Sequence, residues 1–194
     1  MSDSILAWHF VNKTLRDGSP IPKDGEWFVW SGPIEMCRLG LHASLHPFDA
    51  LQYAPGSMLC RVECQGDMQH QDDKLVCRER RIVQRHEMEQ ELRAFAREQA
   101  LSVVHLWNAP PAVIDYLTTG DETKRDAAWA AAGAAAWAAA GAAARAAARA
   151  AAWAAAEDAA EDAARAAARA AARSAWQDRV HRVFSISEGK DVTT

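Results

Sequence analysis

The residue types best suited to chemistry lie in the first half of the chain. His9 stands between two aromatic residues, His42 follows a glycine turn, and Tyr53 ends a short segment that opens with a proline. A dense basic run comes later, formed by Arg78, Arg80, Arg81, Arg85 and His86. Arginines beside a cleft can hold phosphate oxygens through paired hydrogen bonds. The alternative is a solvated edge whose charges pair with the acidic residues that follow.

Each of these residues also has a purely structural interpretation. A strand histidine can form a hydrogen bond within the fold, a histidine beside a turn can bind a loop carbonyl, and a tyrosine at a helix end can pack in the core. These alternatives stay open for His9, His42 and Tyr53.

Cysteine and histidine side chains offer a rival site for a metal ion. The possible ligands are Cys37, Cys60, Cys64 and Cys77, with His42, His46 or His70. Zinc ligands usually lie on turns in closely spaced pairs, whereas Cys60 and Cys64 fall inside a strand pattern. We therefore expect no metal, and interpret these two cysteines as reduced, buried hydrophobic residues.

One stretch resembles a known enzyme superfamily. The segments Cys37–Ser44, Ala50–Tyr53 and Met58–Glu63 give a glycine, an apolar residue, an aromatic position, an alanine, a helix ending in tyrosine, and a strand. This order resembles the central motif of the ADP-ribosyltransferases, particularly the poly-ADP-ribose polymerase branch. The resemblance implies that His42 replaces the first tyrosine of the family and that Tyr53 stacks on nicotinamide.

The same resemblance extends to two further positions. It implies that His9 lies on the family's histidine strand and that Glu79 is the catalytic glutamate, with NAD as the substrate. Phe10 and Val11 stand where the family has small residues, and a bulky Phe10 opposes the close backbone approach that NAD needs. The N-terminal pattern joined to low-complexity repeats also resembles an uncharacterised domain family common in bacteriophage genomes.

Charge and composition exclude several broad classes. The net charge of -4 argues against a general nucleic-acid binder, which needs a basic surplus. The start of the chain has no basic, apolar and small-residue order typical of a secretion signal, and outside the alanine tract no stretch reaches 18 apolar residues without interruption. We expect a cytoplasmic protein, in the host cytoplasm if a phage encodes it, without a membrane span. No Walker loop, GxGxxG, HExxH or GxSxG motif is present.

The elements that position these residues are predicted to form an α+β fold, a small N-terminal mixed domain followed by a long alanine-rich helix. Alternating and β-branched patterns predict strands at Ile5–Val11, Glu26–Trp30, Met58–Cys64 and Leu75–Val83. Helical patterns are predicted at Pro47–Tyr53, Glu87–Leu106 and Ala112–Leu117.

The composition changes near residue 118, which predicts three regions. These are a domain with a ligand pocket at 1–118, a helical oligomerisation segment at 119–184 and a flexible tail at 185–194. Between Trp129 and Arg173 every fourth position is Trp, Gly, Arg or Glu, with alanine dominating between them. With Thr119 and Glu122 as a capping box, one helix would run from Asp121 to Phe184, about 95 Å long. A solvated, low-complexity helix is the alternative.

The charges of this segment suggest an antiparallel pairing between two copies across residues 121–184. With Trp153 opposite Trp153, the matched pairs are Arg145 with Glu161, Arg149 with Glu157, and Trp137 with Arg169. A hairpin that turns near Gly133 or Gly141 is the alternative.

Three functions are compatible with these observations. The first is a phage-type accessory protein that binds and sequesters a nucleotide-like ligand, such as a host immune signal, without catalysis and without a cofactor. Its ligand-binding residues would be His9, His42, Tyr53, Arg78 and Arg80. The second is an ADP-ribosyltransferase-like enzyme that uses NAD through Glu79. The third is a structural or protein-interaction module.

Overall fold

The chain contains two compact units. The computed structural model describes residues 4–15, 18–136 and 154–186, with side chains in all of these except 154–164. Contacts group Met1–Glu89 with Arg173–Thr194, here called the sheet unit, and separate them from Gln90–Ala172, here called the helical unit. This division and the change of composition near residue 118 fall at different places, because residues distant in sequence pack together in the sheet unit.

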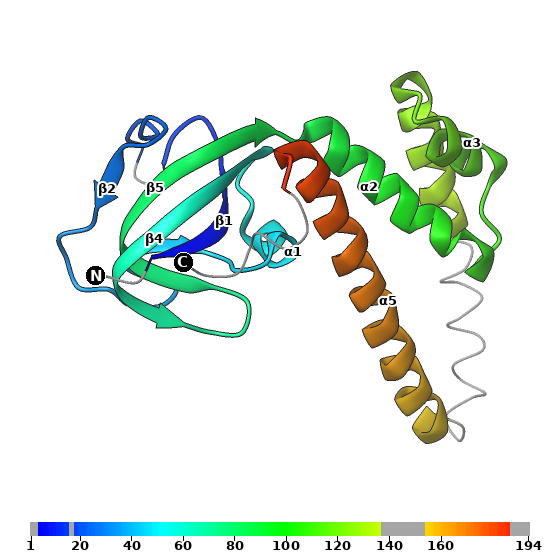
Figure 1. The fold of residues 1–194 in the computed structure, drawn as a ribbon. Helices are drawn as coiled ribbons and strands as arrows, with labels where there is room; N and C mark the ends of the chain where they lie inside the picture. Colours follow the sequence, from blue (N-terminus) through cyan, green and yellow to red (C-terminus); the bar gives the residue numbers. More distant parts are fainter. Residues whose placement is uncertain (1–3, 16–17, 137–153, 187–194) are drawn as a thin grey trace. The chain divides into compact units, whose positions relative to one another are not determined.

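An antiparallel sheet forms the centre of the sheet unit, and the predicted α+β class is confirmed. Its strands are β1 (Ile5–Val11), β2 (Trp27–Val29), β3 (Leu41–Ala43), β4 (Met58–His70) and β5 (Leu75–Glu87). The order is β1-β4-β5-β2, and β3 also pairs with β5 (Figure 1). Both β4 and β5 run beyond the predicted ends. The additional residues of β4 lie near the turn to β5 and those of β5 lie at its far end, and both parts are polar and lack the alternation that identifies a half-buried strand.

The sheet curls until its first strand meets the end of β3. Trp8 and Ser44 exchange both backbone hydrogen bonds, each 2.8 Å long, while β1 pairs along its other edge with β4. The enclosed core consists of small and medium apolar side chains: Ala7, Val11, Leu41, Ala43, Cys60, Val62, Cys64, Leu75, Cys77 and Ile82. The buried cysteines have the core role that the sequence predicts.

Gly40 permits the turn into β3. Its φ of +106° belongs to a region that side-chain-bearing residues avoid, and a Cβ there would lie 2.6 Å from Cγ2 of Val76. The position therefore requires glycine for both backbone conformation and space.

A short helix follows β3 where Pro47 predicts it. α1 (Pro47–Ala50) continues as the 3-10 turn η1 (Leu51–Tyr53) and ends before Pro55. The His46 ring caps α1 by accepting a hydrogen bond from the Phe48 N–H at 3.1 Å.

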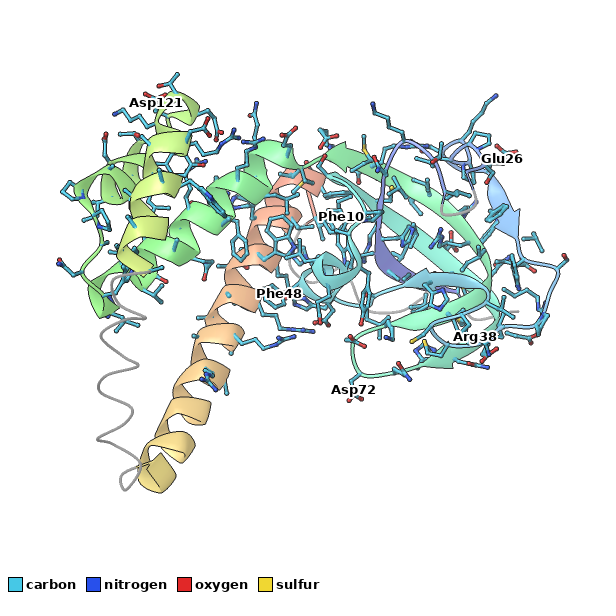
Figure 2. All side chains as sticks on the ribbon, turned by 180° about the vertical axis from the view of Figure 1, so that it is seen from behind. Phe10, Glu26, Arg38, Phe48, Asp72 and Asp121 are labelled. Carbon is cyan, nitrogen blue, oxygen red and sulfur yellow. The ribbon has the colours of Figure 1, made fainter. Side chains whose placement is uncertain are left out.

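The end of the alanine-rich segment belongs to the sheet unit, which the composition does not predict. α5 (Ala154–Phe184) places Trp176 and Val180 in full burial and leaves only 3% of Phe184 exposed. The Trp176 indole donates to the Pro47 carbonyl at 3.1 Å. These last turns, red in Figure 1, lie beside α1, and Figure 2 labels Phe10 of β1 and Phe48 of α1.

The elements of the helical unit are α2 (Glu89–Ser102), η2 (Val104–Leu106), α3 (Pro111–Thr119), η3 (Glu122–Lys124) and a helix at 125–136. Of these, α2 is shorter than the predicted helix and α3 is longer than predicted. The predicted helix Glu87–Leu106 starts later because β5 extends to Glu87. The predicted capping box is wrong, because Thr119 ends α3 and Asp121 accepts the hydrogen bond from the Thr123 N–H instead.

Part of the predicted long helix lies outside the described residues. This applies to 137–153, and so to Trp137, Arg145, Arg149 and Trp153; the side chains of Glu157 and Glu161 are likewise outside. The proposed antiparallel register therefore stays a prediction. Among the described residues, no helix is both long and apolar enough to cross a membrane.

Candidate functional site

Arg80 points into the interior of the curled sheet. The register pairs Cys64 with Arg80 and Val62 with Ile82, so the arginine shares the inward face of these core residues. A register shift between Gln65 and Met68 lets Cys77 face inward as well. Only 8% of Arg80 is exposed, which is unusual for a charged side chain.

Arg80 has no carboxylate partner among the described residues. Its Nη1 donates to the carbonyl oxygen of His42. Its strand neighbours differ: Arg78 pairs with Asp67 at 2.8 Å and Arg81 with Glu63 at 2.6 Å. Arg85 is also paired, with Asp24. Within the part of the chain that the structure describes, three arginines of the basic run are therefore paired with carboxylates, and the buried Arg80 is not.

The thiols near Arg80 do not supply the missing negative charge. Burial raises the pKa of Cys60 to about 11, although Arg85 and Arg80 oppose this rise. A hydrogen bond with Cys77 and burial raise the pKa of Cys64 well above its usual value. Cys77 differs: a hydrogen bond with Cys64 lowers the pKa of its thiol against the effect of burial. In the structure, however, this thiol donates to the Leu41 carbonyl at 3.3 Å, which requires its proton.

His9 lies close to Arg80 on the opposite side of the sheet interior. It occupies the inward position of β1 between Ala7 and Val11. Burial lowers the pKa of His9 well below 6.5, and the positive charges of Arg80 and His42 lower it further. The ring is therefore neutral at pH 7, with one nitrogen donating and one accepting, and it has no hydrogen-bond partner among the described residues.

Arg80 and His9 share a small cavity of about 10 Å³, roughly the space of one water molecule. The other lining residues are apolar: Val11, Leu15, Ile21, Pro22, Phe28 and Ile82. Apolar walls lower the local dielectric constant and so strengthen the attraction between a guanidinium and an anion. One oxygen atom fits this space, and the remaining atoms of a carboxylate or phosphate require the walls to move apart.

His42 supports the site through its backbone. Its carbonyl holds the Arg80 guanidinium, and its ring Nε2 accepts the Cys37 N–H at 2.9 Å. We assign it a positioning role.

The structure places the other sequence-predicted residues elsewhere. Tyr53 is 46% exposed, donates to Asp73 and accepts from the Lys74 ammonium at 3.2 Å, beside the turn between β4 and β5. Arg78 holds a loop by donating to the carbonyls of Trp30 and Gly32. These contacts do not bring Tyr53 or Arg78 to the cavity shared by His9 and Arg80.

Glu79 also lies away from the cavity. Its carboxylate accepts a hydrogen bond from the Gln65 amide at 2.7 Å, and it does not contribute to the cavity lining. In the part of the chain that the structure describes, no three histidine, cysteine or acidic side chains gather as metal ligands.

Sequence comparison covers the strands that build this site. Residues 5–94 match the model of a family described as a domain of unknown function (DUF7666). Comparisons with curated proteins and with solved structures found no match. His9, His42 and Arg80 all fall inside the matched region, whereas the helical cover at Trp176–Phe184 falls outside it.

The sequence predicted Arg80 as a ligand-binding residue together with Arg78, but it did not distinguish Arg80 as the buried arginine of the basic run. Its distinguishing signal is weak, since it is a charge close to Cys77 and Ile82 on a strand whose inward face is otherwise apolar. The apolar lining from the segment between β1 and β2 had no recognisable pattern, because it depends on contacts between distant segments.

Proposed function

We propose that the sheet unit is a binding module for a small anionic ligand, or for the anionic end of a nucleotide-like molecule, held by Arg80 and His9 without turnover. The supporting observation is the buried Arg80 guanidinium without a carboxylate partner among the described residues. Burying an unpaired charge costs several kcal/mol. A bound anion offsets this cost, so the site favours an anionic occupant.

The chemistry of the lining supports an oxyanion in particular. The planar guanidinium can offer two parallel N–H groups to a phosphate or carboxylate. Neutral His9 adds one donor, and the apolar side chains around it keep water away from these hydrogen bonds.

Binding without turnover fits this lining better than ADP-ribosyl transfer. Glu79 hydrogen-bonds Gln65 and Tyr53 hydrogen-bonds Asp73, so neither supports an NAD-cleaving arrangement around Arg80. Sequestration requires affinity and copy number only, which suits a protein that removes a nucleotide signal from solution.

Ligand-induced stabilisation tests the proposal. Inorganic phosphate and a series of nucleoside phosphates are added to the full chain at low salt, and the melting temperature is followed. A ligand that binds the native state raises this temperature. At a ligand concentration a hundredfold above Kd, the free energy of unfolding increases by about 2.7 kcal/mol. Failure of every tested anion to raise it contradicts the proposal.

Two arginine variants locate the site. Arg80→Gln removes the buried charge but keeps donors for the His42 carbonyl, and we expect at least a tenfold loss of affinity by calorimetry. Arg81→Gln is the matched control, because Arg81 lies on the same strand and pairs with Glu63 at the surface. Equal affinities in the two variants would place the ligand elsewhere.

A further inference from the structure

The outer face of the curled sheet has the properties of a helix-docking surface. Trp176, Val180 and Phe184 follow each other at intervals of four residues and form one buried stripe on the last turns of α5. The segment 173–184 is here called the docked segment, and the surface beneath it the docking face.

Aromatic contacts dominate the centre of this interface. The Phe184 ring meets Trp8 edge-on with centroids 5.0 Å apart, and meets His86 at 4.5 Å. Trp176 is fully buried, and its indole N–H reaches the Pro47 carbonyl at the start of α1. Buried aromatic anchors with satisfied polar atoms are typical of interface centres.

Polar contacts surround this centre and fix the position of the helix. Arg173 forms an ion pair with the buried Asp49 of α1. His46 donates from Nε2 to the Gln177 side-chain oxygen at 2.6 Å. An apolar centre with a polar rim is the arrangement by which grooves recognise an amphipathic helix.

The docking face and the docked segment are separate parts of the sequence. The face belongs to the region matched by the domain family, which ends at residue 94, and the docked segment follows roughly 80 residues later. All contacts between them are noncovalent. The same contacts can therefore form when the segment comes from another molecule.

We infer that the docking face accepts residues 173–184 of a second copy of this chain, so that two copies exchange their docked segments. The chain itself carries the sequence that fits the face, down to the Asp49 and His46 contacts. Residues 165–171 are exposed in the described structure, and Trp129 is 81% exposed. Exchange brings two alanine-rich segments together and gives the small side chains at 165–171 a surface to pack against.

A concentration series of the full chain tests the exchange by light scattering. We expect a dimer fraction that increases from micromolar to near-millimolar concentration, and its loss in Trp176→Ala. Trp129→Ala is the control, because it removes an indole from the alanine-rich part only. A chain that stays monomeric throughout overturns the inference, and so does a dimer lost in Trp129→Ala but retained in Trp176→Ala.

A peptide experiment tests the docking face directly. A fluorescent peptide of residues 170–186 is added to full-length Trp176→Ala, whose own segment is weakened, and to the parent chain. We expect the peptide to bind the variant at least tenfold more tightly than the parent, as measured by the rise in anisotropy. A peptide that carries alanine in place of Trp176 should cause no rise.

Full-length Trp176→Ala can also be tested if it does not fold without the peptide. In that case the peptide should restore a cooperative thermal transition to full-length Trp176→Ala. If near-millimolar peptide neither binds to the variant nor restores its cooperative transition, the inference is overturned.

Discussion

The two units of this chain obtain their structure in different ways. The sheet unit buries side chains on both faces of its sheet, with the enclosed apolar core on one side and the docked segment on the other. In the helical unit, the buried apolar residues that the structure describes are Phe95, Val113 and Ala128, while Leu106 and Trp129 stay largely exposed. Packing between distant segments therefore defines the first unit, whereas the second buries few apolar side chains among its described residues.

Exposed ion pairs connect different elements of the helical unit. Arg93 pairs with Glu122 at 2.8 Å and Lys124 with Asp115 at 2.9 Å. Gly120 ends α3 in the left-handed conformation with φ +66°. Exposed ion pairs of this kind each contribute little to the free energy of unfolding.

The largest expected effect is a difference in the free energy of unfolding between alanine variants of two tryptophans that both follow an alanine in the sequence, Trp176 and Trp129. Trp176→Ala should lower the free energy of unfolding by about 3 to 5 kcal/mol, since a fully buried indole leaves a cavity. Trp129→Ala should change it by less than about 0.5 kcal/mol. Urea denaturation followed by circular dichroism measures both, and similar losses would remove the distinction between the units.

A smaller loss is expected from Gly40→Ala in the sheet unit. The new Cβ would meet Val76 at 2.6 Å while the backbone keeps φ +106°, so we expect a cost of about 1 to 3 kcal/mol. Gly18→Ala is the control, because its φ is +85° but nothing lies within 4 Å of its Cβ. If both variants lose equal stability by urea titration, the contact with Val76 contributes nothing.

Acid should weaken the sheet unit through its buried histidine. Burial, Arg80 and His42 lower the pKa of His9 in the folded state, so below about pH 6.5 the unfolded chain binds more protons. The contribution of neutral His9 to stability is fully present above about pH 6.5 and decreases as the pH falls toward the lowered pKa of the folded state. The urea midpoint of unfolding should decrease between pH 7 and pH 5. In His9→Gln this midpoint should change less with pH. His70→Gln is the control, because His70 is exposed, and its midpoint should follow that of the parent. If the midpoint of His9→Gln also decreases as much as that of the parent, this assignment is contradicted.

The smallest predicted effect has the opposite sign. Gly133 lies in the helix at 125–136 with open space around its Cβ position. Gly133→Ala should stabilise this helix by up to about 1 kcal/mol, because alanine has the higher helix propensity. Increased helical ellipticity at intermediate urea concentrations checks it, and a decrease would show that Gly133 has a packing role.

Sequence patterns predicted the features that depend on near neighbours. The bounds of β1, the start of α1 at Pro47 and the inward cysteines of β4 all follow from alternation and turn chemistry. Trp129 and Trp176 show the limit, because both occur among alanines and only the fold makes one exposed and the other buried. Arg80 shows the same limit, since its lack of a carboxylate depends on what surrounds it in space.

The late position of the docked segment also affects how the protein is made. At about 5 to 20 residues per second, synthesis of the roughly 80 residues between the two parts of the sheet unit takes about 4 to 16 s. During this interval the nascent sheet carries Trp8 without Phe184 against it. Newly made chains therefore pass through a stage in which an apolar surface is open to chaperones and to neighbouring nascent chains on the same message.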